Sequence, residues 1–295
     1  MISNPQVFTR DCRETSSGTA FGCPRDFLGN RYVYATLSPR ARGLSLGVNF
    51  NPDKRCNFNC VYCEVNRDGP GGESRLAIPV MMGELEQSLA LVHSGQIRLR
   101  ASYRSVPPEL LKLRHVTLSG DGEPTLCPNF FEAVESVVHL RSGGLFPFFK
   151  LVLITNCIGL DHPDVIEGIS LISPRDEIWV KLDAGTQEYM NRVNRPDCSL
   201  EKILSNILQL GRVRPVVIQS LFTSIKGVGP SSSEIEAYLQ RLHDLKKGGA
   251  QVSLVQIYSA TRPTLHSECG HLSLSMLSHI VRRVRETTGW KAEMF

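Results

Sequence analysis

Residues 44–63 read LSLGVNFNPDKRCNFNCVYC, a short strand-like run followed by a loop that carries Cys56, Cys60 and Cys63. The run from Leu44 to Asn49 is the first of a series of β-rich segments. Three thiols on one loop, at spacings of four and three residues, can converge on a single metal centre. This stretch therefore predicts the start of a sheet and a metal centre at the end of its first strand.

The pattern continues along the chain as strands that alternate with amphipathic helices. Most of the strands are near-continuous runs of Val, Ile and Leu, which is typical of a parallel sheet. Six such units predict a parallel α/β fold, either an open doubly wound sheet or a barrel. The predicted strands are 44–49, 115–119, 151–155, 177–183, 216–222 and 253–258. The predicted buried helix faces include Met82, Leu85, Leu89 and Val92 after the first strand, and Leu274, Leu277, Val281 and Val284 after the sixth.

No linker divides this pattern, so we expect one domain. Residues 1–40 lie outside the alternation and are predicted to be an irregular N-terminal extension, with residues 41–295 forming the core domain.

The composition excludes several classes of protein. The chain has 295 residues, of which 41% are hydrophobic and 21% charged, a globular balance. No apolar run approaches the ~18 residues of a membrane span, and the N-terminus lacks the apolar core of a signal peptide. Nine cysteines, an odd number, argue against a disulfide scaffold and for reduced thiols. We therefore expect a cytoplasmic protein without a membrane partner. The net charge of +4 does not by itself indicate nucleic acid.

Unusual polar residues follow the predicted strands. In parallel α/β folds, ligands gather at the carboxyl ends of the strands. A packed core does not need polar groups at that edge, whereas a cofactor pocket does. The segments concerned are the cysteine loop, Ser119–Thr125 (SGDGEPT), Thr155–Cys157, Lys181–Gly185 (KLDAG), Gln219–Ser220 and Gln256–Arg262.

The cysteine triplet fits one kind of metal centre better than another. A structural zinc site would need a fourth Cys or His nearby, and none occurs in the neighbouring sequence. Three cysteines can instead hold three irons of a [4Fe–4S] cluster and leave the fourth iron open.

The motif CxxxCxxC, with an aromatic residue before the last cysteine, resembles the radical S-adenosylmethionine superfamily. Gly-Asp-Gly-Glu-Pro at 120–124 is similar to that family's Gly-Gly-Glu-Pro loop, and Thr155-Asn156 to its Thr-Asn at the end of the third strand. The resemblance implies a partial (βα)6 TIM-like barrel that binds one [4Fe–4S] cluster and S-adenosylmethionine. It implies cluster ligation by Cys56, Cys60 and Cys63, and cosubstrate contacts from Tyr62, Asp121, Gly122, Glu123 and Asn156.

A narrower resemblance is to a bacterial branch related to the wyosine-synthesising enzymes, which modify a guanosine in tRNA. It rests on segments such as Gly43–Asn49, Lys181–Gly185 and Val193–Pro196. Those enzymes carry a second iron–sulfur cluster on three N-terminal cysteines. Here only Cys12 and Cys23 precede Cys56, which puts the second cluster in doubt.

Lys181 and Asp183 share one face of their strand, because alternate residues point the same way. They are candidate catalytic or cosubstrate-binding residues, and the alternative is an ion pair at a strand end. Arg195 and Arg262 can bind an anion or remain solvated. Cys127, Cys157 and Cys198 can be second-cluster ligands, a catalytic thiol or ordinary half-buried cysteines. Weaker candidates are the pocket-lining Gln219, Gln256 and Tyr258 and a metal site at His266–His271. Two basic patches are further candidates, one in residues 97–115, whose basic side chains lie within 98–114, and one at Arg282, Arg283 and Arg285.

The resemblance implies an enzyme that reductively cleaves S-adenosylmethionine to a 5′-deoxyadenosyl radical for hydrogen abstraction, with tRNA as the leading substrate. The resemblance implies a one-electron donor such as flavodoxin or ferredoxin. One alternative is a radical activase or modifier of a peptide or small metabolite. The other is a non-enzyme, a cysteine-ligated zinc or electron-transfer protein.

Overall fold

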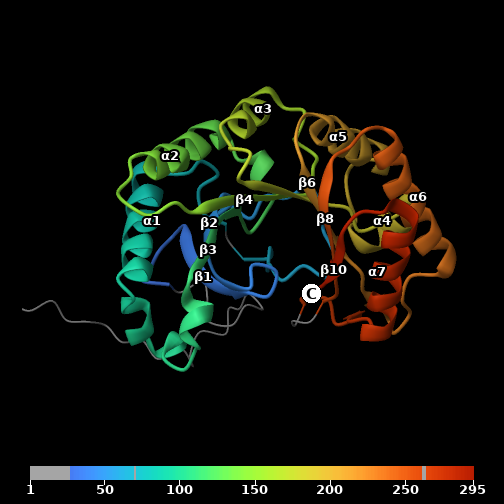
Figure 1. Ribbon diagram of the computed structural model, residues 1–295, viewed down its shortest axis with the longest axis horizontal. Helices are drawn as coiled ribbons and strands as arrows, with labels where there is room; N and C mark the ends of the chain where they lie inside the picture. The colour runs from blue at the N-terminus through green and yellow to red at the C-terminus, as the bar shows by residue number, and fades with distance from the viewer. Residues whose placement is uncertain (1–26, 70, 261–263) are drawn as a thin grey trace, which may run out of the picture.

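A computed structural model describes residues 27–69, 71–260 and 264–295. Its main feature is one curved sheet with helices on its outer, convex face (Figure 1). The strands, in spatial order, are β1 (Val33–Ser38), β2 (Gly43–Asn49), β3 (Leu113–Ser119), β4 (Lys150–Thr155), β5 (Glu177–Lys181), β6 (Val216–Leu221), β8 (Val252–Tyr258) and β10 (Ala292–Met294). The helices are α1 (Ile78–His93), α2 (Phe130–Ser142), α3 (Pro163–Ser170), α4 (Gln187–Val193), α5 (Leu200–Val213), α6 (Ser232–Lys247) and α7 (Leu274–Thr288).

From β2 to β10 every neighbouring pair of strands is parallel, whereas β1 is antiparallel to β2. β1 and β10 form the two ends of the sheet, so among the described strands no pairing closes the barrel. Side chains of the β1–β2 turn cross the remaining seam. The Arg42 guanidinium lies 3.0 Å from the Glu293 carboxylate, and that of Arg40 lies 4.5 Å from the centre of the Tyr258 ring. The predicted partial barrel is confirmed.

The inward face of the sheet changes character along the strands. Val152, Trp179 and Val217 form a small apolar cluster inside the barrel, separate from the core between sheet and helices. One step closer to the carboxyl ends, Gln219 and Gln256 form a hydrogen bond of 3.2 Å between their side-chain amides. The barrel therefore holds an apolar layer at Val152, Trp179 and Val217 and is polar at its carboxyl-terminal end. Two residues before Val152 and Trp179, Lys150 and Glu177 form an ion pair at the amino-terminal end.

Three details differ from the sequence-based expectations. The stretch 1–40 was expected to be irregular, yet Val33–Ser38 form β1, because pairing with the buried β2 satisfies their backbone groups. Helix α1 buries Met81 in place of Met82, and Leu274 at the start of α7 is 71% exposed. The strand β10 was not expected, since three residues are too short for a recognisable pattern. None of the described helices combines the length and apolar character needed to cross a bilayer.

A buried ion pair ties α2 to the strands β4 and β5. The Arg141 guanidinium lies 2.7 Å from the Asp176 carboxylate, and both side chains are at least nine-tenths buried. Asp176 also accepts hydrogen bonds from the backbone N–H of Leu151 and from Ser173. Burial alone would raise the pKa of Asp176, but these donors more than offset it and hold the pKa below its usual range.

We expect Asp176→Asn to lower the free energy of unfolding by about 3–5 kcal/mol, because it leaves a buried guanidinium without its counter-charge. Urea unfolding measures this, and Glu167→Gln on the exposed side of α3 is the matched control, expected to change stability by less than about 0.5 kcal/mol. The Asp176 contribution should be complete above the unfolded carboxyl pKa of about 3.9 and be lost as the pH falls below it. Equal stabilities for the two variants would contradict this account.

Candidate functional site

The three cysteines lie on the loop that follows β2, at the carboxyl-terminal edge of the sheet. Amide groups approach two of the sulfurs. The Phe58 N–H donates to Cys56 Sγ at 3.4 Å, with Asn156 Nδ2 at 3.9 Å, and Asn194 Nδ2 lies 3.5 Å from Cys60 Sγ. N–H donors to sulfur are a common feature of iron–sulfur sites, where they tune the cluster.

The end of helix α4 holds this cysteine loop, residues 56–63, in place. The N–H groups of Asn59 and Val61 donate to the carbonyls of Asn194 and Val193, at 3.0 and 2.8 Å. Phe58 and Val61 are buried and anchor the loop to the core. The segment after α4 therefore runs alongside the cysteine loop and fixes its backbone.

The electrostatics of the loop suit a positively charged partner. Burial raises the pKa of the Cys56 thiol to about 12 and that of Cys60 to about 11. A thiolate at either position needs compensating positive charge, which cluster irons supply. The donor set, three thiols on one loop with amide N–H groups at two of them, fits a [4Fe–4S] cluster.

The Gly120–Pro124 loop after β3 packs directly on the cysteine loop. The Glu123 N–H donates to the Arg55 carbonyl at 3.0 Å, and a Cβ on Gly122 would lie only 1.8 Å from that same oxygen. Only glycine fits such an approach. Asn49, at the end of β2, holds the Gly120–Pro124 loop through two hydrogen bonds. Its side chain donates to Asp121 Oδ2 at 2.7 Å and accepts from the Asp121 N–H at 3.0 Å.

Glu123 ties the ends of β3 and β4 together. One of its carboxylate oxygens accepts from the Thr125 N–H and hydroxyl and from the Thr155 hydroxyl, and the other accepts from the Asn156 N–H at 2.7 Å. The side chain is 2% exposed, and burial raises its pKa despite these donors. Its carboxylate is thus committed to protein groups, and a Glu123 contact with methionine stays a prediction.

Asp183 connects the cysteine loop to the inside of the barrel. Its Oδ2 accepts from the Tyr62 hydroxyl and from Asn194 Nδ2 at 2.8 Å, while its Oδ1 accepts from the Leu221 N–H at 2.7 Å. Lys181 Nζ lies 3.4 Å from Oδ1, so the expected strand-end ion pair exists. The ion pair lies within the site, so a structural ion pair and a binding role for Lys181 and Asp183 do not exclude each other.

Lys181 is enclosed by two tyrosines. Its Nζ donates to the Tyr258 hydroxyl at 3.0 Å and lies 5.1 Å from the centre of the Tyr62 ring. Burial lowers the pKa of Lys181, but Asp183 and Tyr258 outweigh burial and leave the pKa raised. Burial and Asp183 raise the pKa of Tyr62 well above its usual range. The site therefore holds the Lys181 ammonium in place beside the neutral phenol of Tyr62.

Most of the predicted site residues lie at this one edge. Tyr62, Asp121, Gly122, Glu123, Asn156, Lys181 and Asp183 all lie on the loops or strand ends described above, with Gln219, Gln256 and Tyr258 inside the barrel beside them. The sequence analysis did not single out Asn194 or Asn49 as site residues. Both are asparagines in quoted segments, and only their hydrogen bonds reveal their role.

Among the other predicted candidates, Cys157 lies at this edge, with its Sγ 3.8 Å from the Lys181 carbonyl. Cys157 is fully buried, Cys127 is buried beside Asn129, and Cys198 is half-buried. No three His, Cys, Asp or Glu side chains among the described residues are gathered closely enough to hold a single metal ion, which includes the His266–His271 segment. Cysteines that each bind a different iron of a cluster stand farther apart than the ligands of one ion. Cys12, Cys23 and Arg262 lie outside the described residues.

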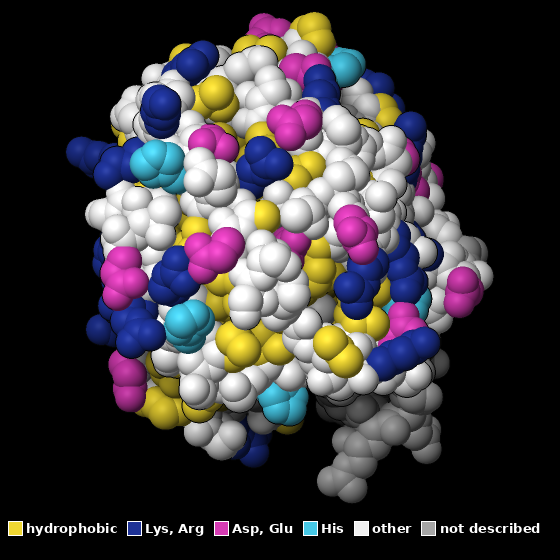
Figure 2. Space-filling model, turned by 90° about the vertical axis from the view of Figure 1, so that its right-hand side faces the viewer, with side chains coloured by type: hydrophobic (Ala, Val, Ile, Leu, Met, Phe, Trp, Pro, Cys, Tyr) yellow, Lys and Arg dark blue, Asp and Glu magenta, His cyan; other side chains and the backbone are white. Residues whose placement is uncertain are grey.

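The two basic patches do not lie at the site. The stretch 98–114 joins α1 to β3 and therefore lies at the amino-terminal edge of the sheet, opposite the cysteine loop. Arg283 pairs with Glu236, and Arg285 donates to the Ala292 carbonyl. The face that includes α6 and α7 mixes positive and negative side chains (Figure 2).

Comparisons with known proteins agree on the family. The sequence model of the radical SAM superfamily matches residues 50–242 of this chain. Relatives include a UPF0026 protein of Helicobacter pylori strain J99, 25% identical over 246 residues, covering 83% of this chain and 72% of the relative. A UPF0026 protein of Synechocystis is 31% identical over 180 residues, covering 59% of this chain and 57% of the relative. The S-adenosyl-L-methionine-dependent tRNA 4-demethylwyosine synthase of Arabidopsis thaliana is 26% identical over 198 residues, covering 63% of this chain and 27% of that protein.

Solved structures share the fold. A radical SAM methyltransferase from Sphaerobacter thermophilus superposes with a TM-score of 0.58 at 16% identity, over 89% of this chain and 68% of that one. The structure of TYW1 with a lysine-pyruvate adduct bound gives a TM-score of 0.52 at 15% identity, over 88% and 85% of the two chains.

We expect Gly122→Ala to push the Gly120–Pro124 loop off the cysteine loop, because the new methyl group would collide with the Arg55 carbonyl. The variant should lose about 1–3 kcal/mol of stability and bind less iron after anaerobic reconstitution. Gly83→Ala is the matched control, since a Cβ there meets nothing within 4 Å. It should gain about 0.5–1 kcal/mol and bind iron normally. Full iron binding by Gly122→Ala would show that the two loops do not depend on each other.

Proposed function

The chain belongs to the radical SAM superfamily, and on that premise we propose that this radical SAM enzyme modifies a nucleoside of transfer RNA through hydrogen-atom abstraction. The tRNA substrate is supported by similarity to the tRNA 4-demethylwyosine synthase of Arabidopsis thaliana. The chain spans only 27% of that protein and 57% of the Synechocystis relative, so substrate and product are proposals.

The structural observation that carries the proposal is the polar end of the barrel beside the cysteine loop. Gln219 and Gln256 form an amide pair there, and Lys181 with Tyr258 adds an ammonium and a hydroxyl. These side chains offer both donors and acceptors, which is what the edge of an unstacked base requires.

Cys56, Cys60 and Cys63 are the proposed ligands of the [4Fe–4S] cluster. When bound, the reduced cluster supplies one electron that breaks the sulfonium bond of S-adenosylmethionine, which yields methionine and a 5′-deoxyadenosyl radical. The protein's own contribution is positional. The Gly120–Pro124 loop, Tyr62 and Asn156 surround the place beside the cysteines where the cosubstrate would bind.

Lys181 is proposed to hold an anionic group, either the cosubstrate carboxylate or a group of the substrate. Asp183 keeps the ammonium charged and aimed, since it lies 3.4 Å from Nζ and is itself fixed by Leu221 and Asn194. The electron is proposed to come from a small redox protein such as flavodoxin or ferredoxin.

We expect the reconstituted protein to hold about four irons per chain, to form 5′-deoxyadenosine with dithionite and S-adenosylmethionine, and to form more of it when tRNA is added. Nuclease digestion and mass spectrometry of that tRNA should show one nucleoside with a changed mass. Cys60→Ala should abolish both products and lose iron. Cys198→Ser, at a half-buried thiol before α5, should retain both.

Formation of 5′-deoxyadenosine with no changed nucleoside and no stimulation by tRNA would contradict the tRNA proposal and favour a peptide or small metabolite as substrate. Bound zinc without 5′-deoxyadenosine would contradict an iron–sulfur role for the cysteines.

We further expect Lys181→Gln to keep its iron but to lower turnover of tRNA roughly 100-fold, because an ordered cation is lost where charge must be held. The comparison is with Tyr258→Phe, which removes only the hydroxyl partner of Lys181 and should have a smaller effect. Steady-state rates with tRNA measure both. Unchanged turnover in Lys181→Gln would mean that Lys181 serves only as an ion pair at the strand end.

A further inference from the structure

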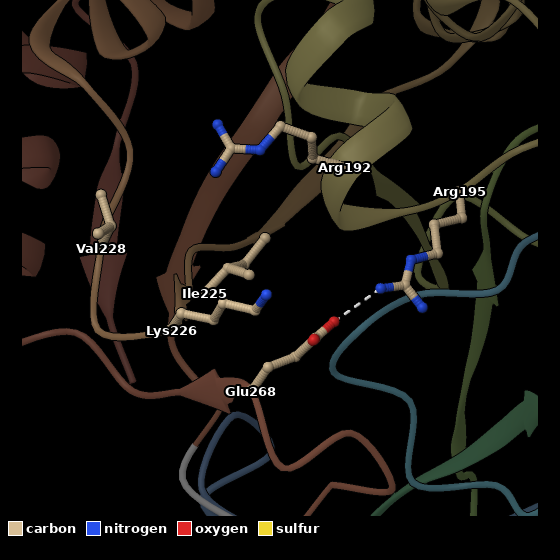
Figure 3. Close-up of a pocket in the computed structure, with 6 residues that line it drawn as sticks. All are labelled: Arg192, Arg195, Ile225, Lys226, Val228 and Glu268. Atoms are coloured by element: carbon tan, nitrogen blue, oxygen red, sulfur yellow. Dashed lines mark hydrogen bonds and ion pairs between the residues drawn. The ribbon is translucent and has the colours of Figure 1, made fainter.

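A surface hollow of about 480 Å³ lies next to the site, between the end of α4 and the ribbon formed by β7 (Ser224–Ile225) and β9 (Cys269–Gly270). Figure 3 shows its lining, in which basic side chains come from both walls. The residues that line it are Arg192, Arg195, Ile225, Lys226, Val228 and Glu268.

The charges of this hollow, called here the α4–β9 hollow, are unbalanced. Glu268 is the one acidic side chain among the described residues that line it, and its carboxylate is already paired with Arg195 at 2.8 Å. Arg192 and Lys226 make no ion pair with any residue that the structure describes. Two uncompensated cations that share one hollow favour an anion between them.

The backbone turns sharply at two cations of the hollow. Arg195 has a φ of 46° and Lys226 a φ of 53°, in the left-handed region that residues with side chains rarely adopt. Hydrogen bonds impose both conformations. The Lys226 N–H donates to the Glu268 carbonyl at 2.8 Å, and the Arg195 N–H to the Met190 carbonyl at 3.1 Å. Arg195 takes this conformation where α4 ends, and Lys226 takes it in the two-residue turn Lys226–Gly227, which the mutual hydrogen bonds of Ile225 and Val228 close. The two turns fix where the side chains of Arg195 and Lys226 leave the backbone.

Both walls of the hollow touch the cysteine loop. On one side, Arg195 directly follows Asn194, whose amide reaches Cys60 and whose carbonyl accepts from the Asn59 N–H. On the other, the Leu265 N–H donates to the Cys63 carbonyl at 3.3 Å, three residues before Glu268. The α4–β9 hollow therefore lies at the rim of the catalytic edge.

We infer that the α4–β9 hollow binds a phosphodiester of the substrate RNA strand and so orients the strand whose base enters the barrel. This inference rests on the proposed function. An arginine and a lysine on opposite walls suit one phosphate held between them. The apolar Ile225 and Val228 give a surface against which a ribose can pack. A surface that binds an acidic protein would instead carry its positive charges over a broad face.

The test compares wild type, Arg192→Gln, Lys226→Gln and the double variant in binding to unfractionated tRNA at several salt concentrations. We expect the double variant to bind about tenfold or more weakly, and the slope of log affinity against log salt to fall in magnitude by about 0.7–0.9, the value for one phosphate contact. Arg98→Gln/Arg100→Gln is the control, because it removes the same charge at the opposite edge of the barrel. That variant should bind like wild type.

Iron content and thermal midpoint show whether each variant is folded. If wild type and the double variant bind tRNA equally, the inference is wrong while the proposed function stands. If tRNA binding is equal but reduction by flavodoxin slows only in the double variant, the hollow receives an acidic redox protein and the inference is wrong. If wild type itself does not bind tRNA, the proposed tRNA function fails together with the inference.

Discussion

The side-chain amide of Asn194 is the contact on which the rest of the site depends. Its Nδ2 lies 3.5 Å from Cys60 Sγ, 3.0 Å from the Tyr62 hydroxyl and 2.8 Å from Asp183 Oδ2. Asn194 is 2% exposed and lies at the end of α4, so its hydrogen bonds hold the end of this helix and the cysteine loop together. Without it, Asp183 would lose a donor, and Cys60 and the Tyr62 hydroxyl would lose the amide that joins them to the end of α4.

Two buried carboxylates extend this arrangement around the edge of the sheet. Asp183 joins β5 to the backbone of β6 through the Leu221 N–H, and Glu123 joins β3 to the end of β4 through Thr155 and Asn156. Buried acceptors of this kind need every donor to be present, because an unpaired one costs about 1–3 kcal/mol. The carboxyl-terminal edge of the sheet is thus held by hydrogen bonds between strand ends, while apolar packing holds the helices.

Much of this could be predicted from the sequence, for identifiable reasons. The parallel strands were recognisable because burial makes them continuous apolar runs, and Cys56, Cys60 and Cys63 because they are close in sequence. β1, β10 and the β7–β9 ribbon were not, since short strands are stabilised by their partners and not by their own composition. The role of Asn194 and the α4–β9 hollow depends on residues from distant segments. The stretch 98–114 shows a related limit, because a count of charges does not say toward which end of a barrel they face.

The most direct test of the central claim is a Mössbauer spectrum of protein reconstituted with ⁵⁷Fe, recorded before and after S-adenosylmethionine is added. Ligation by three cysteines leaves one iron of the four without a protein thiolate. The account predicts that about a quarter of the signal changes when S-adenosylmethionine is added, while the remainder is unchanged. A spectrum that does not respond to S-adenosylmethionine, or four irons that remain equivalent, would contradict it.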